Sequence, residues 1–222
     1  MTLYAAADGS ALGNPGPMGW AWYIDDDRWA AGGAPHGTNN IGELTAVLEL
    51  LRATAHTGED LVVECDSRYV IDAITKWIAG WKRRGWKKAD GKPVLNRELM
   101  EALDSEMQGR QVSFEWVKGH TGHPLNEAAD VRANGAARAF QRGDALDHGP
   151  GFPGTTASAP PAHRASVDET RPDALDGTLF GPLDDDAFTE IRVVLSTDEH
   201  ARLRGRANAA GVSPEQFLRG LI

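Results

Sequence analysis

Three short apolar runs come first, and two more then alternate with three stretches of helical periodicity. This order constrains the fold more than any other feature of the sequence. The runs predict strands at residues 3–7, 20–24, 28–34, 61–65 and 112–117, with a hairpin turn at residues 25–27. Helices are predicted at residues 42–55, after a capping Ser67, and from a capping Asn126 to about residue 142. We therefore expect an α/β protein with a mixed five-stranded sheet flanked by helices.

The chain divides into three parts by composition. Residues 1–142 hold this periodic pattern and all seven tryptophans. Residues 143–187 hold six glycines, six prolines and nine acidic residues against two arginines, which is typical of a disordered acidic linker. Since the linker carries most of the net charge of −9, that charge does not exclude a nucleic-acid partner for the first part. Residues 188–222 regain signals of order.

Other features of the 222 residues bear on the compartment. The sequence holds no apolar run of about 20 residues, so we expect no membrane-spanning helix and no membrane partner. It begins MTLYAAADGS, with no basic start or long apolar stretch, which argues against a secretory signal. A single cysteine, Cys65, excludes an intramolecular disulfide within this sequence. We expect a cytoplasmic protein.

Four carboxylates come from four different elements and could converge at one edge of the sheet. Asp8 and Asp66 close the first and fourth predicted strands, and Glu43 and Asp130 lie in the first turns of two helices. Converging carboxylates repel one another unless cations bridge them, and their hard oxygen atoms suit Mg²⁺ or Mn²⁺. Taken singly, each carboxylate is better explained as a solvated surface charge or an acid at a helix start. Spacing alone does not overturn this interpretation.

The residues around the four carboxylates resemble ribonuclease HI over about residues 2–142. The matching segments, in chain order, are Asp8-Gly9-Ser10, Gly13-Asn14-Pro15-Gly16-Pro17, Thr38-Asn39-Asn40, Glu43-Leu44, Asp66-Ser67, Tyr69-Val70, Lys76-Trp77-Ile78, Trp81-Lys82, Arg84-Gly85-Trp86-Lys87, Trp116-Val117-Lys118-Gly119-His120, Gly122-His123-Pro124, Asn126-Glu127 and Asp130. So many matches in order make a chance resemblance unlikely. The resemblance implies an endoribonuclease that hydrolyses the RNA strand of RNA–DNA hybrids and leaves 5′-phosphate and 3′-hydroxyl ends.

The resemblance also implies the roles of the site residues. Asp8, Glu43, Asp66 and Asp130 would bind two Mg²⁺, with Mn²⁺ as a substitute, and hydrolysis would follow a two-metal-ion mechanism. His120 would sit on a mobile loop near the attacking water or the leaving product, where an imidazole can exchange a proton near neutral pH. A zinc site formed by Cys65, His120 and His123 is the competing interpretation of these side chains. At the level of function, the alternatives are a DNA-acting nuclease or recombinase and a catalytically silent hybrid-binding module.

Two groups of residues are predicted to bind the hybrid. By resemblance, Asn14, Asn39, Asn40 and Arg68 contact its minor groove, where 2′-hydroxyls distinguish RNA from DNA, and Thr38 contacts a DNA phosphate. Residues 76–92, which we call the basic segment, hold seven cationic side chains against one acid, with three tryptophans among them. Within it the expected substrate contacts are Trp81, Lys82, Arg83, Arg84, Trp86, Lys87 and Lys88, whereas Trp77 is assigned to the core.

Three positions depart from the pattern of the family. Gly42 stands before Glu43 where a bulkier Met is usual, and we expect it to loosen the start of that helix. Arg68 stands where Gln is common, so a contact in the groove is expected to differ. Gly135 lies inside the last helix, where glycine costs about 1 kcal/mol relative to alanine. None of these departures removes a predicted metal ligand.

Residues 188–222 follow a strand–helix–helix pattern that weakly resembles the ribbon–helix–helix family. Residues 190–195 alternate, and two capping-box patterns begin at Ser196 and Ser213. So short a unit cannot bury a stable core alone, which favours a homodimer or a protein partner. The alternative is a tail that docks on the first domain or on another protein.

Overall fold

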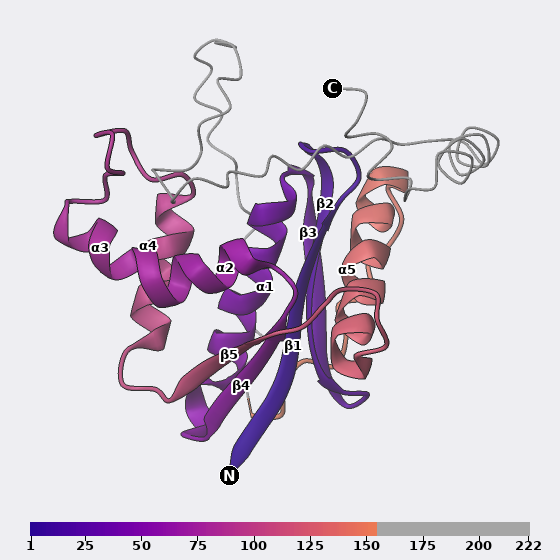
Figure 1. Cartoon of the computed structure of the whole chain (residues 1–222). Coiled ribbons are helices and arrows are strands. Elements are labelled where there is room, and N and C mark those ends of the chain that lie inside the picture. The colour runs from indigo at the N-terminus through magenta and orange to yellow at the C-terminus, as the bar shows by residue number, and fades with distance from the viewer. Residues whose placement is uncertain (155–222) are drawn as a thin grey trace, which may run out of the picture. The chain divides into compact units, whose positions relative to one another are not determined.

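The five expected strands form one mixed sheet in the computed structural model, which describes residues 1–154. The strands are β1 (Thr2–Ala11), β2 (Gly16–Asp25), β3 (Arg28–Gly37), β4 (Asp60–Cys65) and β5 (Val112–Trp116). Their order across the sheet is β3-β2-β1-β4-β5 (Figure 1). β1 pairs antiparallel with β2 and parallel with β4, and β4 pairs parallel with β5. The predicted fold class is confirmed.

The hairpin between β2 and β3 is also as predicted. Asp25 holds its turn, because its carboxylate accepts hydrogen bonds from the Asp27 backbone N–H at 3.2 Å and from the Arg28 Nε at 2.9 Å. The two strands pair antiparallel from Gly16↔Gly37 to Asp25↔Arg28. This pairing makes β3 one edge of the sheet.

The helices differ from the sequence prediction at several ends. They are α1 (Asn39–Thr54), α2 (Arg68–Asp72), a π-helical turn (Ala73–Trp77), α3 (Ile78–Arg83), α4 (Arg97–Met107) and α5 (Pro124–Arg142), with a 3₁₀ turn at Ala55–Thr57. Ser67 caps α2, as predicted. α1 begins at Asn39 rather than Gly42 because Thr38 caps it, accepting from the Ile41 N–H at 3.3 Å. The predicted cap at Asn126 is wrong, since Pro124 occupies the first turn of α5 and His123 is the capping position. α4 was not predicted.

Helices cover both faces of the sheet (Figure 1). On one face, Leu3, Ala5 and Ala7 of β1 share a core cluster with Leu44 and Leu48 of α1. The other face packs against α5 through small side chains such as Ala133 and Ala136. Small residues let a helix backbone approach the sheet closely. Within residues 1–154, none of the helices has both the length and the apolar character needed to span a membrane.

Residues 143–154, which we call the β3-covering segment, correct the predicted linker. The backbone of His148 accepts from Ala31 of β3 at 3.1 Å, and Gly151 donates to Trp29 of β3 at 3.0 Å. Leu146 and Phe152 pack against the two core clusters. The prediction of disorder from residue 143 is therefore wrong for these twelve residues, because two apolar anchors and an open strand edge outweigh their average composition. The rest of the predicted linker and the segment 188–222 lie outside the described residues.

Candidate active site

Asp8 and Asp66 lie side by side at the point where β1 and β4 stop pairing. The parallel pairing of these strands ends at Ala6↔Glu64, so Asp8 and Asp66, two residues further along each strand direction, are level with one another. Asp66 follows β4 directly, as predicted. Asp8 does not close β1, because the antiparallel pairing with β2 continues from Asp8↔Ala21 to Ala11↔Met18. The Asp8 carboxylate is thus held on a strand paired on one side only.

Glu43 joins them because α1 lies unusually close to β1 and β2. A Cβ atom on Gly42 would meet the Gly19 carbonyl oxygen at 2.8 Å and the Gly9 Cα at 3.2 Å. A Cβ atom on Gly9 would overlap the backbone of Gly42 and Glu43. We expected Gly42 to loosen the start of the helix. Instead, its lack of a side chain permits close contact between the backbones of α1, β1 and β2. Since α1 starts at Asn39, Glu43 lies one turn into the helix rather than in its first turn, and it is buried.

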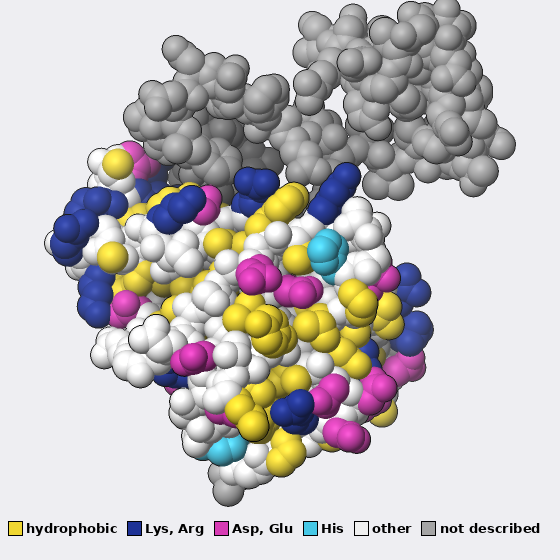
Figure 2. All heavy atoms as spheres, turned by 60° about the horizontal axis from the view of Figure 1, so that its bottom comes forward, with side chains coloured by type: hydrophobic (Ala, Val, Ile, Leu, Met, Phe, Trp, Pro, Cys, Tyr) yellow, Lys and Arg dark blue, Asp and Glu magenta, His cyan; other side chains and the backbone are white. Residues whose placement is uncertain are grey.

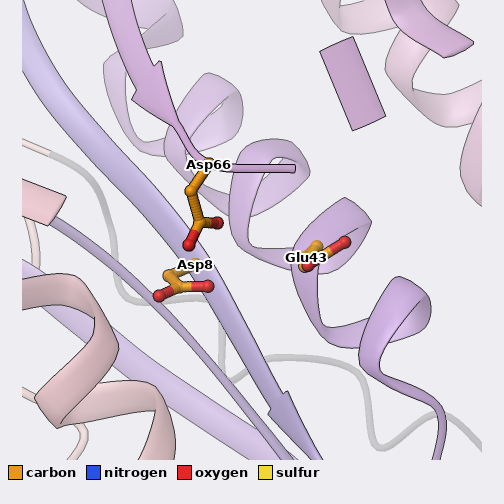
Figure 3. A group of neighbouring side chains, drawn as sticks. All are labelled: Asp8, Glu43 and Asp66. Carbon is orange, nitrogen blue, oxygen red and sulfur yellow. The ribbon is translucent and has the colours of Figure 1, made fainter. Parts of the chain in front are cut away.

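Asp8, Glu43 and Asp66 form what we call the carboxylate cluster. One ligand oxygen from each lies within 4.8 Å of the others, and Figure 3 shows the Asp8 and Asp66 carboxylates directed toward one another beside Glu43. Asp8 is only 6% exposed. Burial and, next, the Asp66 carboxylate raise the pKa of Asp8 to about 8, with smaller contributions from Asp130 and Glu43. This accumulation of negative charge is what a bound cation would relieve.

Hydrogen bonds fix the orientation of the Glu43 carboxylate. Asn39 Nδ2 donates to Oε1 at 2.8 Å, and the Ser67 hydroxyl donates to Oε2 at 2.7 Å. Ser67 also accepts from the Val70 N–H as the cap of α2, so the start of α2 is tied to α1 through Glu43. The sequence predicts the cap but carries no signal for the bond to Glu43, which depends on how α1 and β4 meet in space.

The position of the Asp66 carboxylate depends on the lack of a side chain at Gly119. A Cβ atom on Gly119, in the turn after β5, would overlap Asp66 Oδ2. Any side chain larger than hydrogen at this position would force this carboxylate oxygen to move. The sequence analysis assigned Gly119 only to the matching motif and missed this role.

Asp130 and His120 lie beside the carboxylate cluster and form a pair of their own. Asp130 is close enough to contribute to the raised pKa of Asp8, but it is outside the group within 4.8 Å. Its Oδ2 lies 3.6 Å from Nδ1 of His120, whose side chain is 78% exposed. His120 has a left-handed backbone (φ 56°) in the turn before α5. Three of the four predicted ligands therefore meet, with the fourth adjacent.

The competing zinc site is not formed among the described residues. Cys65 is buried in the core, with its Sγ 3.9 Å from the Ser67 carbonyl oxygen, and burial raises the pKa of its thiol. A cysteine binds zinc as its thiolate, which this environment disfavours. Neither Cys65, His120 nor His123 belongs to the group of converging ligands found in residues 1–154.

The predicted groove contacts gather at the helix starts next to the carboxylate cluster. Asn14 Oδ1 accepts from the Asn39 N–H at 3.2 Å, which joins the loop after β1 to the start of α1. Thr38 caps α1, and Asn40 lies in its first turn. Arg68 is the first residue of α2, where its guanidinium stacks on the Trp116 ring. Asn39 also bonds to Glu43, so the start of α1 is joined directly to the cluster.

The basic segment holds two kinds of cation. Lys76, Lys82 and Lys92 form ion pairs with Asp72, Asp104 and Asp90. Arg83, Arg84, Lys87 and Lys88 form no ion pair among the described residues, and Lys88 alone of them is half-buried. Figure 2 shows Lys and Arg side chains gathered at the left edge, where α3 and the following loop lie in Figure 1. This edge is therefore a cationic surface.

The three tryptophans of the basic segment differ less in burial than predicted. Trp77, Trp81 and Trp86 are all half-buried and all pack against the larger core cluster. The rings of Trp77 and Trp81 lie 5.7 Å apart between centroids. Packing against the core is thus shared by Trp77 in the π-helical turn, Trp81 in α3 and Trp86 in the loop after α3, and substrate contact by Trp81 and Trp86 stays a prediction.

Comparisons with known proteins agree on one family. The model of the family described as RNase H matches residues 1–138. The Ribonuclease H of Tropheryma whipplei (strain Twist) is 55% identical over 150 residues, covering 68% of this chain and 93% of that protein. The Ribonuclease HI of Streptomyces coelicolor is 49% identical over 140 residues, covering 60% of each chain.

Solved structures agree as well. The crystal structure of LC9-RNase H1, a type 1 RNase H with the type 2 active-site motif, is 32% identical with a TM-score of 0.56. The match covers 68% of this chain and 77% of that one. A foamy viral protease-reverse transcriptase in complex with RNA/DNA hybrid has a TM-score of 0.54 at 15% identity, over 60% of this chain and 20% of that one. At so low an identity, the second likeness concerns the fold alone.

Proposed function

The chain belongs to the RNase H family, and from this premise we propose how its residues hydrolyse RNA. It is an endoribonuclease that acts on RNA–DNA hybrids. The observation that carries it is the carboxylate cluster, in which three acids from three elements lie within 4.8 Å.

The cluster fits divalent metal ions, on which the family depends. Its ligands are hard oxygens, Asp8 is almost fully buried, and a neighbouring carboxylate raises the pKa of Asp8. We assign Asp8, Glu43, Asp66 and Asp130 as ligands of two Mg²⁺, for which Mn²⁺ can substitute. When bound, such ions lower the pKa of the attacking water and neutralise charge on the leaving 3′ oxygen. Asn39 and Ser67 keep the Glu43 carboxylate aimed at the cluster.

His120 is suited to moving a proton at the edge of the site. Its Nδ1 faces Asp130, which leaves Nε2 to meet a water molecule or the product. The ring is largely exposed and lies on a turn, so it can approach the scissile phosphate from solvent. The Asp130 carboxylate beside Nδ1 orients the imidazole.

Hybrid binding is divided between the groove contacts and the basic segment. Asn14, Asn39, Asn40 and Arg68 offer amide and guanidinium groups to base edges and 2′-hydroxyls in the minor groove, and Thr38 offers its hydroxyl to a DNA phosphate. The basic segment supplies phosphate contacts farther from the cluster through Trp81, Lys82, Arg83, Arg84, Trp86, Lys87 and Lys88.

The test is cleavage of a labelled duplex panel by the full chain. With Mg²⁺, the RNA strand of an RNA–DNA hybrid should be cut to 5′-phosphate and 3′-hydroxyl ends, whereas DNA–DNA duplex and chelated samples stay intact. Asp8→Asn or Asp66→Asn should lower kcat by about 10³-fold or more while hybrid binding survives. Asp60→Asn, which changes an exposed acid at the opposite end of β4 from Asp66, is the matched control.

The outcomes separate the alternatives. Cleavage retained in both Asp8→Asn and Asp66→Asn would contradict the proposed ligands. Cleavage of DNA–DNA duplex without cleavage of the hybrid would favour a DNA-acting nuclease. Binding without turnover under any divalent ion would favour a silent binding module.

Further assignments concern the domain that carries catalysis, the location of the protein and the role of residues 188–222. We assign catalysis to residues 1–142, a cytoplasmic location to the protein, and self-association or a protein partner to residues 188–222. The support is the apolar alternation of that last segment and its small size. Light scattering of the full chain at micromolar concentration should give a dimer, and a monomer would favour a docking tail.

A further inference from the structure

Trp116 is a large aromatic residue that the core does not use. It ends β5 and is 46% exposed, although its neighbour two residues earlier, Phe114, packs against the core. Its Cα pairs with Cys65, the last residue of β4. Trp116 therefore lies beside the end of β4, next to Asp66.

The indole of Trp116 supports the backbone of Asp66. Its Nε1 donates to the Asp66 carbonyl oxygen at 3.0 Å, and the next residue, Val117, donates to the Cys65 carbonyl oxygen at 3.2 Å. The Asp66 carbonyl lies after the last ladder bond of β4 and before the first bond of α2, which runs from Ile71 to Ser67. A side chain thus supplies a donor where neither the sheet nor the helix offers one. The bond holds the turn from which the Asp66 carboxylate projects.

The ring of Trp116 also orients Arg68. The Arg68 guanidinium carbon lies 4.2 Å from the ring centroid, a cation–π contact. Arg68 occupies the first turn of α2, where the helix dipole disfavours a cation, so helix stability does not account for its presence. Stacking on one face leaves the N–H groups at the rim of the guanidinium pointing outward, toward solvent or a bound duplex.

We propose that Trp116 is a positioning residue that couples the two parts of the site, holding the Asp66 turn for the metal ions through its N–H and the Arg68 guanidinium for the hybrid groove through its ring. The first half concerns the free protein. The second half rests on the proposed function, because Arg68 must meet a bound hybrid there.

Two substitutions separate the two contacts. Trp116→Phe keeps a ring for Arg68 but removes the N–H, and Trp116→Leu removes both. Trp116→Phe should weaken Mn²⁺ binding to the free protein by about fivefold, the factor that corresponds to a hydrogen bond of about 1 kcal/mol. It should raise the Mg²⁺ concentration for half-maximal activity similarly while the KM for hybrid stays unchanged. Phe114→Leu, a loss of an aromatic ring on the same strand, is the matched control and should change neither quantity.

The Arg68 contact is tested by a double-mutant cycle. At saturating Mg²⁺, Arg68→Leu should raise KM about two- to fivefold with kcat unchanged. Trp116→Leu should raise KM by a similar factor when Arg68 is present and by little in the Arg68→Leu background. If Trp116→Leu does not fold, Arg68→Lys, which keeps the charge but loses the planar stack, replaces it and should raise KM similarly.

Each half has an outcome that overturns it. Equal Mn²⁺ affinity of Trp116→Phe and the unaltered protein, measured by calorimetry without substrate, would overturn the role of the N–H. An equal rise in KM with and without Arg68 would overturn the role of the ring. Failure of the unaltered protein to cleave hybrids would count against the proposed function and the Arg68 half that rests on it, but not against the role of the N–H, since Mn²⁺ binding is measured in the free protein.

Discussion

The carboxylate cluster and the basic segment are both charged, but they are built in opposite ways. The cluster consists of short side chains on adjoining elements, two of them buried and one beside Gly119, so packing limits where their carboxylates can lie. The unpaired cations of the basic segment sit on long side chains that are mostly exposed. The difference indicates that the cluster acts through geometry and the basic segment through electrostatic attraction that salt screens.

Among changes that keep all the carboxylates, the largest expected effect comes from adding a methyl group beside the cluster. Gly119→Ala would place its Cβ on Asp66 Oδ2, so the carboxylate must move. A displacement of about 1 Å in such a site typically costs about 100-fold in rate, and we expect kcat at saturating Mg²⁺ to fall by that factor with KM little changed. Steady-state kinetics on a short hybrid measures both.

Gly135→Ala is the matched control for that substitution. A Cβ at Gly135, on the exposed side of α5, meets nothing within 4 Å. Activity should be unaffected, and the free energy of unfolding should rise by about 1 kcal/mol because alanine favours the helix. A normal kcat in Gly119→Ala would mean that the site tolerates a displaced Asp66 carboxylate. The contrast between a cluster that acts through geometry and the basic segment would then not hold.

The next effect is on stability without divalent ions. Asp8 has a pKa of about 8 in the folded protein and an ordinary low value when unfolded, so between these values the folded state retains a proton that the unfolded state releases. The free energy of unfolding should therefore fall as the pH rises from about 4 to about 8. Asp8→Asn carries no such proton and should be more stable than the unaltered protein by about 2 kcal/mol at pH 8, but not at pH 4.

Denaturant unfolding with chelator at several pH values measures this difference. Saturating Mg²⁺ should reverse it, because a cation bound to the carboxylates stabilises the folded state of the unaltered protein more than that of the variant. If the difference in unfolding free energy between Asp8→Asn and the unaltered protein does not change with pH, the pKa of Asp8 is not raised in the metal-free cluster.

The smallest effect concerns the basic segment. Replacing Lys87 and Lys88 by Ala should raise KM about three- to tenfold at low salt and reduce the slope of log KM against log salt by about 1 to 2, with kcat unchanged. Lys76 and Lys92 already contact carboxylates, so the matched double substitution to Ala should have a weaker effect. A fall in kcat equal to that in kcat/KM would place the segment in the chemical step.

The order of elements and the residues that follow them could be predicted because they depend on local pattern. The apolar run before Asp66 and the capping Ser67 predicted a strand end with a carboxylate and a helix start, as observed. α4 has apolar residues at helical spacing, but Asn96 at its start makes no side-chain capping bond, so the local signal was weak. The cap was misplaced at Asn126 because the helix-starting preference of Pro124 was not weighed against it.

What sequence could not supply are the contacts between distant elements. The bond from Ser67 to Glu43 and the space that Gly119 leaves for Asp66 each join residues more than twenty positions apart. The effect of Gly42 was predicted with the wrong sign, because glycine was judged by helix propensity rather than by its contact with β1 and β2. Average composition likewise concealed Leu146 and Phe152, whose packing orders the β3-covering segment.

The β3-covering segment has a consequence for aggregation and for shortened forms of the protein. An uncovered edge strand offers its free N–H and C=O groups to other chains, and such edges pair with one another when proteins are concentrated. Here Ala31 and Trp29 already bond to residues 148 and 151. A protein cut after residue 142 would keep the carboxylate cluster yet expose this edge and the apolar surface beneath Phe152. One that ends at residue 154 would retain its own protection against edge-to-edge association, so solubility and cleavage can be separated by these twelve residues.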